Sequence, residues 1–300
     1  MPITRKIMGV SSYVAPATGN KAIFGYGSGP VSITNLVNNS GVVSTDTTGV
    51  GTARSLLAAA GYGTDKAIFG YGITGAAVSV TNLVSSSGVV SADVTGIGTA
   101  RRALAAAGYG TDKAIFGYGF TTTYTALTNK VSNIGVVATD TTGVGTARGW
   151  LAAAGYGTDK AIFGYGENGS NKSLTNKVSN IGVVATDTTG VGTARADIAA
   201  AGYGTDKAIF GYGNTGVRVS ATNKVSNIGV VATDTTGVGT ARYDLAAAGY
   251  GGDKAIFGYG NTVTGNGSMT NLVSSSGVVS ADVTGIGTAR NSLAASSYGT

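Results

Sequence analysis

The feature that most constrains this chain is a seven-residue segment, KAIFGYG, that occurs six times without a change. Its copies begin at Lys21, Lys66, Lys113, Lys160, Lys207 and Lys254. Successive copies are 45, 47, 47, 47 and 47 residues apart, so nearly the whole sequence is one repeated unit. A period of this length is typical of propellers and solenoids, because one repeat cannot bury its apolar surface alone and needs its neighbours.

Strand and turn signals within one unit favour a propeller. The unit that starts at Leu151 reads LAAAGYGTDKAIFGYG, then a variable stretch, then LTNKVSNIGVVATDTTGVGTAR. Four short apolar or β-branched runs alternate with turn clusters, and no stretch shows a sustained helical period. Four antiparallel strands per unit correspond to one propeller blade. The sequence therefore predicts an all-β, six-bladed β-propeller with four antiparallel strands and near-identical blades, forming a single domain over residues 1–300.

First-strand signals occur seven times, one more than six blades need. RKIMGVSSYV near the N-terminus aligns with RNSLAASSYG near the C-terminus. We expect residues 291–300 to supply the inner strand that closes the ring beside the strand at Lys21. Residues 1–14 would then be an extra N-terminal strand, an interpretation that fits them better than a weak signal peptide.

The order TARxxLAAAGYGTDKAIFGYG followed by TNxVSNxGVV resembles the repeat of the kelch and galactose-oxidase type of propeller over nearly the whole chain. That repeat has an Arg, an inner strand of small residues, a second strand ending in glycines and two outer strands. Here the glycine doublet is Gly-Tyr-Gly and the outer-strand Trp is missing. The resemblance implies the architecture and no activity. A propeller of the chromatin-condensation-regulator type is the alternative.

Two places differ strongly between units: the stretch after each KAIFGYG and the pair of residues after each repeated Arg. In an up-and-down blade both places lie on one face, whereas the GTDK and SNIG turns lie on the other and barely vary. A constant scaffold with diverse loops on one surface is typical of recognition proteins. We therefore expect a ligand-binding face that includes Arg102, Phe120, Tyr124, Trp150, Glu167, Asn171, Lys172, Asp197, Arg218, Tyr243 and Asp244. The other interpretation is drift in tolerant surface loops.

Residue types that carry chemistry are scarce. Cysteine and histidine are absent, which removes thiolate ligands, the commonest metal ligand and the commonest general base. GVGTAR and GYGTDK lack the Lys-Ser/Thr ending of a phosphate loop and are better explained as tight turns. The Asp of TDTTG is more simply a turn residue than a calcium ligand. We expect no enzyme activity, no cofactor and no metal.

The net charge of +6 gives no clear basic patch, because the repeated Lys, Arg and Asp residues nearly cancel. We therefore expect no nucleic-acid partner, no membrane insertion and a monomer. Near-perfect repeats with exchanged loops resemble those of phage-associated or environmental repeat proteins. That resemblance implies adhesion to a glycan or protein surface, including phage host-surface recognition, with a virion-associated or extracellular location. The alternative is a structural or engineered repeat scaffold that has no specific ligand.

Overall fold

The structure is a computed structural model that describes residues 20–300. It is all-β, with six three-stranded antiparallel sheets and one two-stranded hairpin. Within residues 20–300 there is no helix that is long and apolar enough to span a membrane. The strand expected over residues 1–14 lies outside the described residues.

Five sheets are continuous in sequence, and one joins the two ends of the chain. Sheet 1 contains β1 (Lys21–Gly27), β2 (Val31–Val37) and β20 (Ala294–Tyr298). The others are sheet 2, with β3 (Ala58–Tyr62), β4 (Lys66–Gly70) and β5 (Thr81–Val84); sheet 3, with β6 (Ala105–Tyr109), β7 (Lys113–Gly117) and β8 (Thr128–Val131); sheet 4, with β9 (Ala152–Tyr156), β10 (Lys160–Gly164) and β11 (Thr175–Val178); sheet 5, with β12 (Ala199–Tyr203), β13 (Lys207–Gly211) and β14 (Thr222–Val225); and sheet 6, with β15 (Ala246–Tyr250), β16 (Lys254–Gly258) and β19 (Thr270–Val273). The hairpin is β17 (Asn261–Thr262) and β18 (Gly265–Asn266).

The pairing expected for the C-terminal segment is present. β20 runs antiparallel to β1, with Lys21 opposite Tyr298 and Gly25 opposite Ala294. β20 thus occupies the position in sheet 1 that β3, β6, β9, β12 and β15 occupy in the other sheets.

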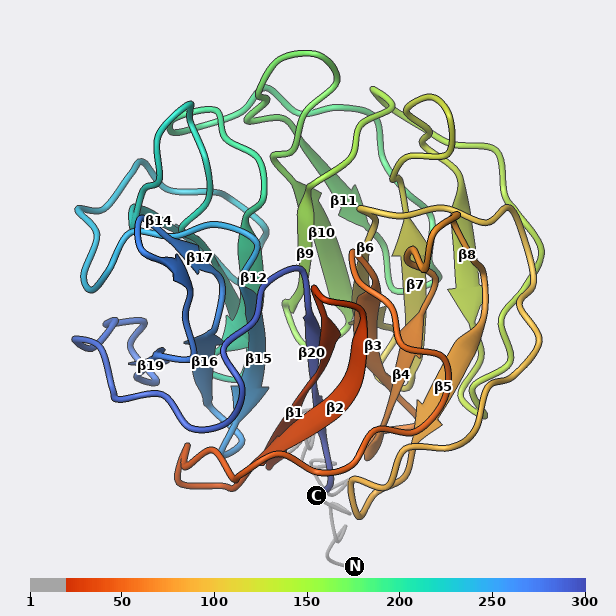
Figure 1. Ribbon diagram of the computed structural model, residues 1–300. Helices are drawn as coiled ribbons and strands as arrows, with labels where there is room; N and C mark the ends of the chain where they lie inside the picture. The colour runs from red at the N-terminus through yellow and green to blue at the C-terminus, as the bar shows by residue number, and fades with distance from the viewer. Residues whose placement is uncertain (1–19) are drawn as a thin grey trace, which may run out of the picture.

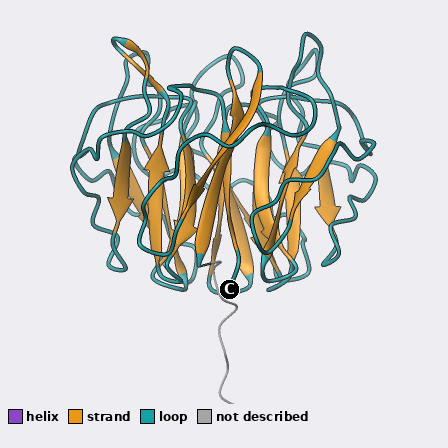
Figure 2. Cartoon of the chain, turned by 60° about the horizontal axis from the view of Figure 1, so that its bottom comes forward, coloured by secondary structure: helices purple, strands orange, loops and turns teal. Residues whose placement is uncertain are grey.

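The sheets follow one another around a common centre (Figure 1). Each first strand contacts the first strands of the two neighbouring sheets, in the order β3, β6, β9, β12, β15, β20 and back to β3. The strands have long connections at one end and short turns at the other (Figure 2). We call the side that carries the stretches after each KAIFGYG the loop face. The side that carries the GTDK turns is the turn face.

The fourth strand expected in each unit is not a strand. In sheet 4 the segment after β11 makes only two isolated bridges, Thr175 with Thr188 and Val178 with Val184. The register shifts by one residue between these bridges, which interrupts a regular ladder. The side-chain amide of Asn176 donates to the carbonyl of Ala185 at 3.0 Å. A buried asparagine therefore makes a bond that a backbone N–H would make in a continuous strand.

The constancy of KAIFGYG follows from burial on both faces of its strand. In β1, Ala22, Ile23, Phe24 and Tyr26 are all fully buried, because sheets pack against both sides. A Cβ atom on Gly25 would lie 2.7 Å from the ring of Phe69 in sheet 2. Alanine at this position would clash with the neighbouring sheet, so the glycine is required.

A buried arginine joins each sheet to the preceding one. The guanidinium of Arg148 donates to the carbonyls of Tyr165 (2.8 Å) and Thr146 (3.0 Å) and to Oδ1 of Asn176 (2.7 Å). It also lies over the ring of Tyr118 in sheet 3, 4.4 Å from its centroid. Lysine could not replace this arginine, because only a planar guanidinium can stack on a ring and direct several donors at the same time. Equivalent residues are Arg54, Arg101, Arg195, Arg242 and Arg290.

An aspartate completes this connection, which we call the latch: the arginine, the tyrosine under it, and the asparagine and aspartate of the sheet that follows. Asp187 accepts from the N–H and hydroxyl of Thr146 at 3.0 and 2.6 Å, and from the amide of Asn176 at 2.9 Å. Partial burial alone would raise the pKa of Asp187, but these donors outweigh it and hold the pKa below its usual value. Thr146 lies 41 residues earlier in the chain. The aspartate of TDTTG is therefore a contact between sheets and not a residue of its own turn.

Candidate recognition surface

The two variable places of each unit meet through backbone hydrogen bonds on the loop face. Arg102 follows the latch arginine, and Phe120 follows KAIFGYG. Each donates its N–H to the carbonyl of the other, at 3.0 and 2.8 Å. The same bridge joins Ser55 to Ile73, Gly149 to Glu167, Ala196 to Asn214 and Tyr243 to Asn261. Because the backbone makes these bonds, the side chains at these positions can change without breaking them.

The second residue of each variable pair takes part in a closed circuit. We call these six residues the hexad: Leu56, Ala103, Trp150, Asp197, Asp244 and Ser292. Ala103 donates its N–H to the carbonyl of Leu56, and Trp150 donates to Ala103. The pattern continues to Ser292, whose carbonyl accepts from Leu56, and all six bonds measure 2.8–3.0 Å.

The hexad backbone has an unusual conformation. All six residues have φ between 51° and 54°, in the left-handed region that side chains with a Cβ rarely adopt. The bonds of the circuit offset this cost. Since none of these bonds uses a side chain, leucine, alanine, tryptophan, aspartate and serine are all tolerated at one structural position.

Aromatic side chains gather on one sector of the loop face, over sheets 3 and 4. The ring of Phe120 lies 5.2 Å from Tyr124 and 5.9 Å from Trp150, between ring centroids. The guanidinium of Arg102 lies 5.0 Å from the centroid of Phe120. All four side chains are half-buried, so each leaves part of its surface open to a ligand. Rigid aromatic rings beside an arginine are the residue types that anchor interfaces.

Several predicted site residues reach to the next sheet. The hydroxyl of Tyr124 donates to Oε1 of Glu167 at 3.1 Å, and the amide of Asn171 donates to the carbonyl of Asn214 at 3.0 Å. Arg218 donates to Oδ1 of Asn261 at 2.7 Å. These variable side chains therefore hold neighbouring loops together, a role that the sequence analysis did not identify.

Two further predicted residues lie beside this row. The guanidinium of Arg218 stands over the ring of Tyr243, 4.9 Å from its centroid. The ammonium of Lys172 donates to the hydroxyl of Ser170 within its own loop at 2.7 Å. Sequence reasoning missed Asn214 and Asn261, although they occupy the repeat position of Phe120 and Glu167 and could have been found by that alignment.

The hexad surrounds a cavity of about 70 Å³, which is also lined by the apolar residue that follows each hexad member, such as Leu151 after Trp150. Within the hexad itself, Leu56, Ala103 and Trp150 are apolar and adjacent, and Asp197, Asp244 and Ser292 are polar and adjacent. Burial raises the pKa of Asp197, and the carboxylates of Asp244 and Glu167 raise it further. Burial also raises the pKa of Asp244, although Ser292 donates its hydroxyl at 3.1 Å. Both carboxyl groups are thus inclined to hold a proton.

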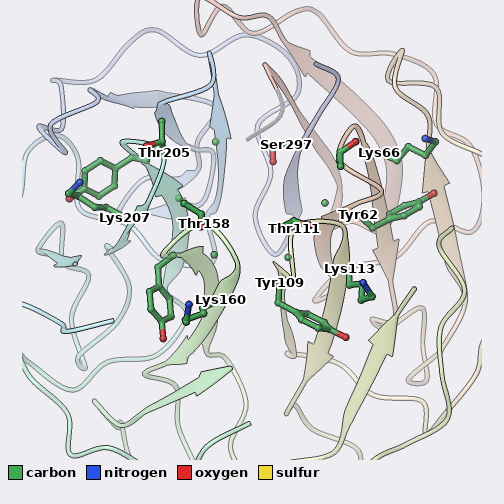
Figure 3. Close-up of a pocket in the computed structure, with 18 residues that line it drawn as sticks. Tyr62, Lys66, Tyr109, Thr111, Lys113, Thr158, Lys160, Thr205, Lys207 and Ser297 are labelled. Carbon is green, nitrogen blue, oxygen red and sulfur yellow. The ribbon is translucent and has the colours of Figure 1, made fainter. Parts of the chain in front are cut away.

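A second cavity, of about 170 Å³, opens on the turn face. In sheets 2 to 5 its lining repeats a glycine, a tyrosine, a threonine and the lysine of KAIFGYG, whereas sheet 6 contributes Gly249 and sheet 1 contributes Ser297. Figure 3 shows Thr111 and Thr158 nearer to the middle of the opening than Lys113 and Lys160. Each of these lysines pairs with the aspartate before it, for example Lys160 with Asp159 at 2.5 Å. The sequence predicted only turns on this face.

The eleven residues selected from the sequence thus lie together on the loop face, in sheets 3 to 6. Among residues 20–300 no three histidine, cysteine, aspartate or glutamate side chains are placed to hold a metal ion. No protein-family model matches the chain, and no curated protein matches its sequence.

Proposed function

We propose that the six sheets are the blades of a closed six-bladed β-propeller of kelch-like type. Three observations support this. The first strands contact one another in cyclic order, and the hexad forms a circuit of hydrogen bonds on the loop face. On the turn face a second circuit runs through the GTDK turns, where Gly110 donates to the carbonyl of Asp159 at 2.7 Å and five equivalent bonds follow.

The propeller serves as a non-catalytic recognition protein whose loop face binds a glycan or protein surface. The observation that supports this is that, at the variable positions, the backbone makes the structural bonds and the side chain is left available for a ligand. Their backbones make the same bonds in sheet after sheet, while their side chains range from Trp150 to Asp197. Structure alone gives no reason to place aromatic rings there. Trp150, Phe120 and Tyr124 offer rigid surface that can stack on a sugar ring or fill a pocket of a partner.

Adhesion of a virion to a host surface, outside the cell, is the biological setting that we propose for this binding. The second candidate is a repeat scaffold with no ligand. It is favoured by the contacts of Tyr124, Asn171 and Arg218, because each of these side chains already has a polar partner in the next sheet.

The test is a glycan array together with binding to intact bacterial cells, for the unaltered chain and for Trp150→Ala/Tyr243→Ala. Loss of about 2 kcal/mol of binding free energy in the double variant, with a cooperative melting transition that is lowered by no more than a few degrees, supports recognition. The matched control is Val89→Ala, which removes an exposed apolar side chain from the turn face. No binding to either probe by the unaltered chain supports the scaffold, and equal binding by both variants moves the site away from the loop face.

A further inference from the structure

The turn face differs between two halves of the molecule, a distinction that the near-constant turn sequences conceal. In sheets 3, 4 and 5 the turn after the third strand has isoleucine at its tip, and the strand has lysine one residue before its end. Sheets 6, 1 and 2 have serine and leucine at these two positions. In sheets 3, 4 and 5 the turn tips are Ile134, Ile181 and Ile228, and the strand residues are Lys130, Lys177 and Lys224. In sheets 6, 1 and 2 the turn tips are Ser276, Ser40 and Ser87, and the strand residues are Leu272, Leu36 and Leu83.

The isoleucine tips are among the most exposed apolar side chains of residues 20–300. Ile134 is 73% exposed, and Ile181 and Ile228 are each 70% exposed. A valine two residues further on is exposed in every sheet, and Val136 is an example. We call the three isoleucines with Val136, Val183 and Val230 the isoleucine arc. It is an apolar edge on neighbouring sheets, and within the described chain nothing covers it.

The net positive charge of the described residues lies entirely on this face. The six latch arginines face six latch aspartates, and on the loop face three cations match three carboxylates. The turn face has nine lysines against five aspartates, a surplus of four. Five lysines of KAIFGYG pair with the aspartate before them, which leaves the surplus at four positions. These are Lys21, Lys130, Lys177 and Lys224.

Two of these four lysines donate directly to the isoleucine arc, and a third reaches the turn of the sheet next to it. Nζ of Lys130 donates to the carbonyl of Ile181 at 3.1 Å, and Nζ of Lys177 donates to the carbonyl of Ile228 at 3.1 Å. Lys224 makes the same bond to Ser276. The uncompensated ammonium groups therefore lie at the turns of sheets 4, 5 and 6, and those of sheets 4 and 5 coincide with isoleucine tips.

We propose that the turn face of sheets 3 to 5 docks on the surface of an anionic lipid bilayer. Isoleucine and valine tips enter the boundary between headgroups and acyl chains, and the lysines beside them attract the negative surface. Every surplus cation here is a lysine, so the bidentate contacts of arginine have no counterpart in these turns. The tyrosine rings that contact the tip glycines, such as Tyr62 at Gly135, are buried and offer no face for stacking on nucleic-acid bases. This docking does not depend on what the loop face binds.

The experiment is sedimentation of the full chain with vesicles of phosphatidylcholine alone or with phosphatidylserine added. We expect binding to the anionic vesicles, weaker binding to neutral ones and release at high salt. Ile134→Ser/Ile181→Ser/Ile228→Ser should lower the partition coefficient by about tenfold, through lost apolar burial. Lys130→Leu/Lys177→Leu/Lys224→Leu should abolish the preference for anionic over neutral vesicles. Both variants introduce residues that sheets 6, 1 and 2 already carry there, so both should fold.

The matched control is Val217→Ser/Val263→Ser, which removes exposed apolar side chains from the loop face and should sediment like the unaltered chain. Equal binding by the isoleucine variant, or no binding of the unaltered chain to anionic vesicles, overturns the proposal. A duplex oligonucleotide, tested in parallel, should not bind. Binding to it without binding to vesicles would assign the lysines to nucleic acid instead.

Discussion

Arg148 and Trp150 are two residues apart, yet one belongs to the latch and the other to the hexad. Both lie where neighbouring sheets meet. The latch uses the side chain of Arg148 for its bonds, so the residue is the same in all six sheets. The hexad uses the backbone of Trp150, so six sheets carry five different residues there. Whether side chain or backbone makes the structural bond decides which position can be used for recognition.

The largest effect should come from removing β20. This deletion tests whether a latch without the strand pairing can hold two sheets together. The latch of Arg290 joins opposite ends of the chain, with bonds of 2.8 Å to the carbonyl of Tyr26 and 2.7 Å to Asn35. Deleting residues 294–300 leaves that latch intact but removes the partner of β1 and exposes a strand edge. Soluble monomer, measured by size-exclusion chromatography, should fall sharply. Deleting residues 1–14 should be milder, and the reverse order would mean that β20 is not the essential partner of β1.

Arg148→Ala should cost about 3 kcal/mol or more in the free energy of unfolding. It leaves the carbonyl of Tyr165 and Oδ1 of Asn176 buried without a donor, and it removes the cation from beside Asp187. Trp150→Ala, the control two residues away, should cost about 1 kcal/mol, because its side chain is half-buried and its backbone bonds remain. Urea unfolding of both variants gives the comparison. Equal losses would show that the hexad side chains are structural too.

Asp187 and Asp197 should respond to pH in opposite directions. The pKa of latch Asp187 is lowered on folding, so its stabilisation is present above the unfolded pKa and is lost as pH falls through the folded one. The pKa of Asp197 is raised, so its stabilisation is present at low pH and is lost as pH rises through the folded pKa. Asp197→Asn should therefore melt about 2 to 4 °C above the unaltered chain near pH 9 and close to it only below the unfolded pKa, near pH 3.5. Asp187→Asn should lower the melting temperature at both pH values, and matching profiles for the two variants would contradict the assignment.

The smallest effect should come from the turn face. The carboxylate of Asp159 pairs with the adjacent Lys160, near the surface. The bond from Gly110 goes to the backbone carbonyl of Asp159, which alanine retains. Asp159→Ala should therefore cost no more than about 0.5 kcal/mol, measured by thermal melting beside Arg148→Ala. A cost near that of the latch variant would show that the turn circuit depends on the side chain.

The repeat predicted most of the strands, because KAIFGYG and the small-residue strand before it are both regular and buried. It also predicted that the variable places share a face, since strand direction alone settles that. The prediction of a fourth strand in each unit was wrong. GVVATDT has the composition of a strand, but the buried amide of Asn176 takes the Ala185 carbonyl and leaves two isolated bridges. Composition cannot reveal such competition between a side chain and the backbone.

Contacts between units were the harder part of the site to predict. The sequence shows that Arg148 and Asp187 recur, but an exact repeat gives no sign of whether a residue bonds within its own unit or with the next. Asp187 bonds to Thr146, in the segment that precedes its own sheet, and Tyr124 bonds to Glu167 in the next unit. The difference between Ile134 and Ser87 was visible in the sequence. Its meaning depends on knowing that sheets 3, 4 and 5 are neighbours and that the tips are exposed.

The pairing of β20 with β1 also sets the order in which the protein can fold during synthesis. Lys21 and Tyr298 are opposite one another although nearly the whole described chain separates them. Sheets 2 to 6 can form as each unit leaves the ribosome, because their strands are close in sequence. β1 and β2 emerge first and must wait with one edge unpaired until every other strand has been made. During that interval the nascent chain is open to pairing with another copy, so translation speed and chaperone access should affect the yield of this protein more than its final stability does.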